Sequence, residues 1–141
     1  MIDVLEHIEQ DEVQVQKVAS VLTPGGQFIV VVPAYQALYG ERDRLMGHYR
    51  RYSAAGLRKL LESNGFKVDH VRYWNMLGVL PYFVSEKILR RPLHAPLRGQ
   101  KKRGSLAAFV QKILFAWFSL VENNFDFGFG LSIMVTATKK S

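Results

Sequence analysis

The sequence has 141 residues, of which 48% are hydrophobic, 12% aromatic and 22% charged. These values predict a single globular domain and exclude a disordered, collagen-like or low-complexity chain. The absence of cysteine excludes a disulfide scaffold, a thiolate metal site and a cysteine nucleophile, and it fits a reducing compartment. Lys and Arg number 19 against 12 Asp and Glu, and this net charge of +7 makes an anionic partner one expectation.

The first quarter of the chain predicts a helix followed by a strand. Apolar residues recur at helical spacing from Asp11 to Leu22, and a proline–glycine turn at 23–26 ends this helix. The residues at 28–32 are all apolar, which is typical of a strand covered on both faces, as in a parallel sheet with helices on either side. No full strand precedes this one, so we expect an exposed edge at Gln27–Pro33 through which two copies would pair.

The middle of the chain predicts a loop, a helix and a second strand. Residues 35–52 are polar, aromatic and basic without clear periodicity, which indicates a loop. Ser53 is a suitable N-cap for the helix that follows, and Gly65 is suited to its C-terminal end. Alternating apolar residues predict a strand at 66–73, with a phase slip at His70.

The last part predicts two more helices and a final strand. Residues 74–89 have a helical pattern interrupted by Pro81, and a basic loop follows at 90–104. An apolar helix is expected at 106–122, and a period-2 pattern predicts a strand at 130–138. Helices and strands that alternate in this order predict an α/β layered domain.

Four short motifs in this order resemble class I S-adenosylmethionine-dependent methyltransferases, in the branch similar to ubiquinone-biosynthesis O-methyltransferases. The motifs are Asp3-Val4-Leu5-Glu6-His7-Ile8, Leu22-Thr23-Pro24-Gly25-Gly26, Gly47-His48-Tyr49-Arg50-Arg51-Tyr52 and Gly130-Leu131-Ser132-Ile133. The resemblance covers nearly the whole chain. It implies one partial methyltransferase domain at 1–141, the C-terminal part of a Rossmann-like sheet with flanking helices and an antiparallel last strand.

The sequence also departs from this family. The first strand with its acidic residue and G-x-G-x-G turn is absent, and Gly128-Phe129-Gly130 lies too near the C-terminus to replace it. We therefore expect a truncated gene, a miscalled start or a split protein. The resemblance implies S-adenosylmethionine-dependent methyl transfer to a small-molecule or lipid-linked acceptor in the full-length protein, with the fragment inactive alone.

The resemblance implies that Ile2, Asp3 and Leu5 contact the cofactor, at the carboxyl end of a strand where ligands of open α/β sheets bind. The alternative is that Leu5 and Ile8 are core residues, while Glu6 and His7 begin a helix. In some similar enzymes an acidic residue followed by x-x-E-H holds Mg²⁺, here Asp3, Glu6 and His7. The sequence favours acids at the start of a helix over a magnesium site.

Two histidines are the candidate general bases, since an imidazole titrates near neutrality and accepts a proton from a phenol or an alcohol. They are His7 and His48, and the second lies in a loop that the family places over the acceptor. This resemblance makes Tyr35, Tyr49 and Arg50 candidate substrate-binding residues. The alternative is a solvated basic loop whose tyrosines pack on the domain.

A second class of function is a non-catalytic, basic membrane- or partner-binding module. Residues 87–103 contain seven Lys and Arg and no acid, and they precede a helix with Phe109, Phe115, Trp117 and Phe118. Basic residues beside an aromatic helix suit an anionic membrane surface and a lipid-like acceptor, whereas the alternative is a basic loop followed by a core helix. The basic run lacks interleaved aromatic residues and a reader motif, which argues against nucleic acid. Without a secretory signal, the expected location is cytoplasmic, or peripheral at the inner membrane face.

Overall fold

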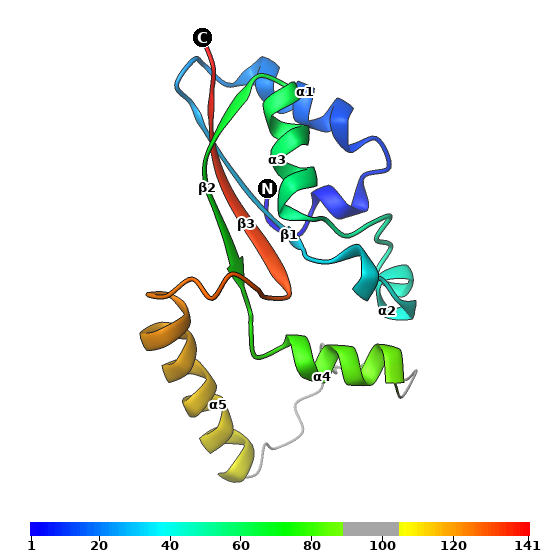
Figure 1. The fold of residues 1–141 in the computed structure, drawn as a ribbon, viewed down its shortest axis with the longest axis vertical. Coiled ribbons are helices and arrows are strands. Elements are labelled where there is room, and N and C mark those ends of the chain that lie inside the picture. Colours follow the sequence, from blue (N-terminus) through cyan, green and yellow to red (C-terminus); the bar gives the residue numbers. More distant parts are fainter. Residues whose placement is uncertain (89–104) are drawn as a thin grey trace.

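A computed structural model describes residues 1–88 and 105–141, so the predicted basic loop at 90–104 lies outside the described residues (Figure 1). The described chain is a mixed α/β fold in which a small sheet carries helices. In chain order its elements are the 3-10 helix η1 (Leu5–His7), α1 (Asp11–Val21), β1 (Gln27–Pro33), the 3-10 helix η2 (Gln36–Leu38), α2 (Glu41–Leu45), α3 (Ala54–Ser63), β2 (Phe66–Trp74), α4 (Val79–Phe83), the π-helix η3 (Val84–Ile88), α5 (Ser105–Trp117), the π-helix η4 (Phe118–Glu122) and β3 (Ser132–Lys139).

The sheet has the strand order β1-β3-β2, and β3 runs antiparallel to both neighbours. Val135 of β3 lies opposite Val30 on one side and Val71 on the other. The register of β2 shifts between Val68 and His70, which confirms the predicted phase slip. Because β1 and β2 are parallel to each other and β3 is antiparallel to both, the C-terminal ends of β1 and β2 lie beside the start of β3 at one end of the sheet.

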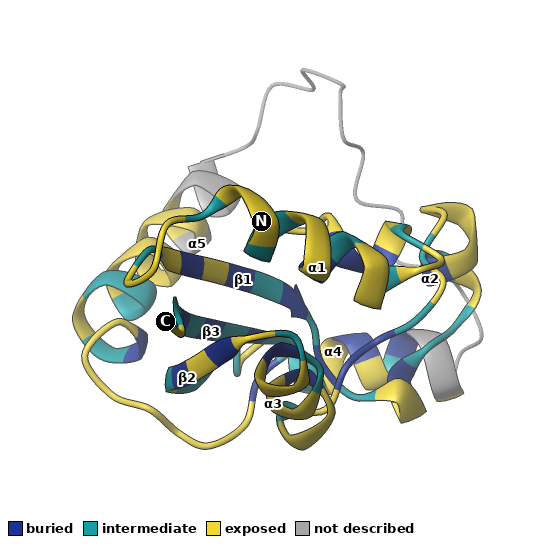
Figure 2. Cartoon of the chain, turned by 90° about the horizontal axis from the view of Figure 1, so that it is seen from above, coloured by how far each residue is buried: buried dark blue, intermediate teal, exposed yellow. Residues whose placement is uncertain are grey.

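The core lies between one face of the sheet and the helices α1 and α3 (Figure 2). Val15 of α1 and Leu57 and Leu61 of α3 are fully buried against the strands. The predicted helical face of α1 and the predicted cap of α3 are both confirmed: the Ser53 hydroxyl accepts a hydrogen bond from the Gly56 amide at 3.0 Å.

The expectation that both faces of β1 are covered is wrong for the described residues. Burial alternates along the strand, so that Val30 and Val32 are buried while Ile29 is 47% exposed. A run of apolar residues fills both faces of a strand with apolar side chains, but it does not determine whether a second layer of helices is present. Among residues 1–88 and 105–141, α1 and α3 supply the cover on one face only.

The outer edge of β1 is partly paired by the first three residues. The amide of Val31 donates to Met1 O at 2.9 Å, and the amide of Asp3 donates to Val31 O at 3.0 Å. Ile2 thereby forms a parallel bridge with Val31, as expected of a strand end placed before η1. Pairing of two copies through the rest of this edge stays a prediction.

Two predicted boundaries differ from the structure. Pro81 does not interrupt a helix that starts at Trp74; instead Trp74 belongs to β2, and α4 starts at Val79. Pro81 then lies in the first turn of α4, where a missing N–H costs no helical hydrogen bond. The predicted loop at 35–52 contains two short helices, η2 and α2, which are too short to produce a periodic pattern.

Gly130 is required where β3 begins beside the end of β2. A Cβ at this position would lie 2.8 Å from the Trp74 nitrogen and closer still to its carbonyl group. We expect Gly130→Ala to lower the free energy of unfolding by about 1–3 kcal/mol, because backbone must move to admit the methyl group. Urea denaturation measures this change.

Gly56→Ala is the matched control, since this helical glycine meets only the Ser53 hydroxyl. Its effect should stay within about 1 kcal/mol, since alanine is the better helix former. Equal effects of the two substitutions would show that the close approach at Gly130 is not a constraint.

Candidate functional site

Strained backbone marks the ends of three strands. Among residues 1–88 and 105–141, the non-glycine residues with positive φ are Asp3 (50°), Tyr35 (62°) and Asn75 (64°). Asp3 follows the short parallel bridge, Tyr35 follows β1 and Asn75 follows β2 directly. Such conformations cost free energy and cluster at functional sites, so the three together indicate a site at this edge of the sheet.

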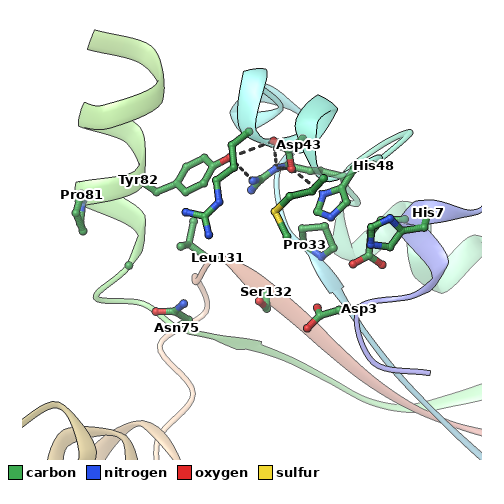
Figure 3. A pocket seen from close by; sticks show the side chains of 15 residues that line it. Asp3, His7, Pro33, Asp43, His48, Asn75, Pro81, Tyr82, Leu131 and Ser132 are labelled. Carbon is green, nitrogen blue, oxygen red and sulfur yellow. Dashed lines mark hydrogen bonds and ion pairs between the residues drawn. The ribbon is translucent and has the colours of Figure 1, made fainter. Parts of the chain in front are cut away.

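A pocket of about 380 Å³ opens at this edge (Figure 3). It lies where β1 and β2 end and β3 begins, between η1, α2 and α4. Its lining consists of Asp3, Glu6, His7, Pro33, Arg42, Asp43, Met46, His48, Arg51, Asn75, Gly78, Pro81, Tyr82, Leu131 and Ser132. The many acidic, basic and imidazole groups suit a polar ligand.

One wall of the pocket is a buried polar network centred on Asp43, whose side chain is 1% exposed. Arg51 Nε donates to both carboxylate oxygens at 2.9 and 3.0 Å, and the Tyr82 hydroxyl donates to Oδ2 at 3.0 Å. The Arg51 guanidinium also lies over the Tyr82 ring, 4.5 Å from its centroid. The network therefore joins α2, the loop after it and α4.

Asp43 also fixes the tautomer of His48. Burial alone would raise the pKa of Asp43, but the hydrogen bond and charge of Arg51, with the His48 contact, hold this pKa below its ordinary value. An ionised carboxylate only accepts hydrogen bonds, so His48 Nδ1, 2.9 Å from Asp43 Oδ1, carries the proton. In the neutral ring, Nε2 then keeps its lone pair for a proton or a metal ion.

A second cluster consists of Glu6, His7 and His48, whose nearest ligand atoms all lie within 4.8 Å of one another. The two rings are in edge contact, with centroids 4.6 Å apart. Glu6 is 1% exposed and its Oε2 has no hydrogen-bond partner, and burial raises the pKa of this carboxyl group. A backbone hydrogen bond of 2.8 Å from the Tyr49 amide to Glu6 O holds the two segments together.

One carboxylate and two imidazoles can hold a divalent cation. Imidazole ligands suit Zn²⁺ and similar transition metals better than Mg²⁺, which prefers oxygen. Asp43 would serve as the outer partner that orients His48, a common arrangement behind metal-bound histidines. The sequence offered Asp3, Glu6 and His7 as possible ligands, whereas the structure groups His48 in place of Asp3 with Glu6 and His7.

Only some of the predicted catalytic and cofactor-binding residues line the pocket. Asp3, His7 and His48 line the pocket, whereas Ile2 lies beside it on the exposed bridge. Leu5 is fully buried in the core. Contact of Ile2, Asp3 and Leu5 with a cofactor stays a prediction.

The three predicted substrate-binding residues lie outside the pocket lining. Tyr35 stacks on Tyr73 with ring centroids 5.6 Å apart, and burial raises the pKa of Tyr35. Arg50 forms an ion pair of 2.7 Å with Asp11 of α1, and Tyr49 is half-exposed. Their role in acceptor binding therefore remains a prediction.

Sequence reasoning missed three residues that shape the pocket: Asp43, Asn75 and Tyr82. Asp43 is five residues before His48, but no helical or strand pattern connects the two. Tyr82 reaches the network from α4, 39 positions beyond Asp43. The available signal was the Asn at the end of β2, since Asn tolerates positive φ.

Comparison with solved structures shows a methyltransferase-like fold. A protein assigned as a methyltransferase, in complex with the Haloferax volcanii Trm112 methyltransferase activator, has a TM-score of 0.52 at 10% identity, covering 99% of this chain and 52% of that one. A protein from Bacillus halodurans C-125 assigned as a methyltransferase has a TM-score of 0.51 at 17% identity, covering 98% and 62%. The cyclase SpnF has a TM-score of 0.50 at 19% identity, covering 99% and 48%.

These similarities establish the fold alone. The chain spans about half the length of the solved structures that it matches. No family model and no curated protein matches it, so the ubiquinone-biosynthesis branch stays a prediction. The neighbours include a cyclase, which shows that this fold carries more than one kind of reaction.

Asp43→Asn should lower the free energy of unfolding by about 3–5 kcal/mol, because it leaves the buried Arg51 charge unpaired. The depressed pKa of Asp43 means that its contribution is present above the ordinary value of 3.8 and is lost as the pH falls below it. Urea denaturation at neutral and acidic pH measures both effects.

Glu41→Gln is the control on the same helix, since Glu41 makes an exposed ion pair with Arg44 at 3.4 Å. It should cost no more than about 1 kcal/mol. A similar loss in both variants would contradict a stabilising role for the buried network.

Zn²⁺ should stabilise the protein through Glu6, His7 and His48. At a free concentration of 100 times the dissociation constant, binding adds about 2.7 kcal/mol to the free energy of unfolding. Glu6→Gln should remove this gain. Because burial raises the Glu6 pKa, the same substitution should raise stability in metal-free buffer at neutral pH.

Thermal unfolding with and without Zn²⁺ tests both parts. Glu9→Gln, at an exposed position on the same segment, should behave as the wild type. An unchanged Zn²⁺ effect in Glu6→Gln would exclude this cluster as the metal site.

Proposed function

We propose that the protein acts in S-adenosylmethionine-dependent methyl transfer to a hydroxyl group, and that the pocket at the strand ends receives the acceptor. The observation that carries this proposal is the oriented His48, which lies in the pocket with one nitrogen held by Asp43 and the other left as a base. The methyltransferase-like fold supports the reaction class. A small polar acceptor suits both the pocket volume of about 380 Å³ and its charged lining better than a large apolar one.

The cofactor would lie against the outer end of β1. Asp3 lines the acceptor pocket and also a second pocket of about 300 Å³ on the face of the sheet opposite α1 and α3. Exposed Ile2 offers an apolar contact there, and the Asp3 carboxylate offers a hydrogen-bond acceptor. S-Adenosylmethionine would supply an electrophilic methyl group, whose former bonding electron pair returns to sulfur.

The protein's own task is to hold the acceptor and remove its proton. As the acceptor oxygen bonds to the methyl carbon, His48 Nε2, which is free as a base only when no metal ion is bound to it, would take the hydroxyl proton, and the ionised Asp43 would stabilise the resulting imidazolium. Arg51 and Tyr82 keep the Asp43 carboxylate in place, so that the base is oriented before the acceptor binds. His7 lies in contact with the His48 ring and is the second candidate base.

The proposal is tested by a methyl-transfer assay with labelled S-adenosylmethionine and a panel of phenols, enols and alcohols. The enzyme should be the product of the whole reading frame that contains these 141 residues. We expect His48→Asn to lower the rate constant by about 100- to 10,000-fold, as for loss of a general base, with a smaller effect on cofactor binding.

His70→Asn is the matched control, because His70 is exposed on β2 and lies outside the pocket lining. It should retain the wild-type rate. Equal rates in wild type and His48→Asn would exclude His48 as the base. Failure of the wild type to bind S-adenosylhomocysteine would overturn the proposed function itself.

A further inference from the structure

Helix α5 exposes an unusual amount of apolar surface. Phe109 is 61% exposed and Phe115 is 73% exposed, and Ile113 is also more than half exposed. Phe109, Ile113 and Ala116 follow one another at i, i+4 and i+7, so they form one apolar stripe along the helix, with Lys112 beside it. A contiguous exposed apolar surface marks an interaction site.

The helix is fastened at its C-terminal end. Trp74 of β2 contacts the Phe118 ring with centroids 5.3 Å apart, and Trp117 stacks on Phe127 at 6.3 Å. Arg72 donates hydrogen bonds to carbonyl groups at the end of η4, including Asn123 O at 2.9 Å. The preceding turns of α5 extend away from the sheet (Figure 1), and Phe109 and Ile113 of the stripe are both more than half exposed.

Charge distinguishes among the surfaces that could cover this stripe. In the sequence, residues 87–103 hold seven Lys and Arg without an acid, and 105–121 add Lys112 and again no acid. A lysine on the border of an apolar face can keep its ammonium in the headgroup layer while its stem lies along apolar surface. An apolar, aromatic helix joined to such a basic run complements an anionic lipid surface.

We propose that α5 docks on the surface of an anionic bilayer, with the stripe of Phe109, Ile113 and Ala116 inserted at the headgroup level. Phe115 is 73% exposed but lies on the other side of Lys112, outside this stripe. No described helix is long and apolar enough to cross a membrane, so the helix lies along the interface. This inference does not depend on methyl transfer and holds for a non-catalytic protein as well.

Co-sedimentation with vesicles tests the proposal. The full chain should pellet with vesicles that contain phosphatidylglycerol and much less with vesicles of phosphatidylcholine alone. The double variant Phe109→Ser/Ile113→Ser should lower the partition coefficient by at least about tenfold, as expected from the apolar area that a phenylalanine and an isoleucine bury. Both side chains are exposed, so the variant should keep the wild-type circular dichroism spectrum.

Val21→Ser is the control, since Val21 is an exposed apolar residue on α1. It should bind vesicles as the wild type does. The proposal is overturned if the wild type fails to bind anionic vesicles at low salt, if it binds neutral vesicles equally well, or if the double variant binds like the wild type. A dimer in sedimentation equilibrium without vesicles that the double variant abolishes would instead identify α5 as an interface between copies.

Discussion

The buried carboxylate of Asp43 is the interaction on which the site depends. The segment at 34–52 contributes few apolar side chains to the core, so polar contacts must hold its short helices in place. Asp43 supplies these contacts at one point, to Arg51, His48 and Tyr82. A buried charge is costly unless it is paired. With all partners present the network therefore stabilises the loop, whereas removal of one partner leaves an unpaired charge in the interior.

The antiparallel strand β3 determines where the pocket beside this network lies. Its insertion between two strands that run the same way brings the start of β3 to the edge where β1 and β2 end. Leu131 donates its amide to Asn75 O at 3.2 Å, and Ala34 donates its amide to Leu131 O at 2.7 Å. Segments far apart in the sequence are thus joined by backbone hydrogen bonds, and this pairing holds Asn75 in its conformation with positive φ.

Local patterns in the sequence predicted most of the elements, because each depends on neighbouring residues. Ser53 and the apolar positions of α3, the phase slip near His70 and the alternation of β3 all act within one element. The pocket could be predicted only in part. His48 was a candidate because its chemistry is recognisable, but its pairing with Asp43 and its approach to Glu6 depend on how a non-periodic loop folds over η1. Whether helices pack on the second face of β1 likewise depends on the tertiary structure, and the valines of the strand do not determine it.

The segment that ends β2 connects the pocket to the apolar helix. Trp74 contacts η4 through Phe118, and Asn75 lines the pocket. The next residue, Met76, donates its amide to Glu122 Oε1 at 2.6 Å, and Glu122 is buried at the end of η4. One wall of the pocket and the attachment of α5 are therefore formed by consecutive residues. The pocket and the helix that we propose to dock on a bilayer are therefore connected through the segment from Trp74 to Met76 at the end of β2.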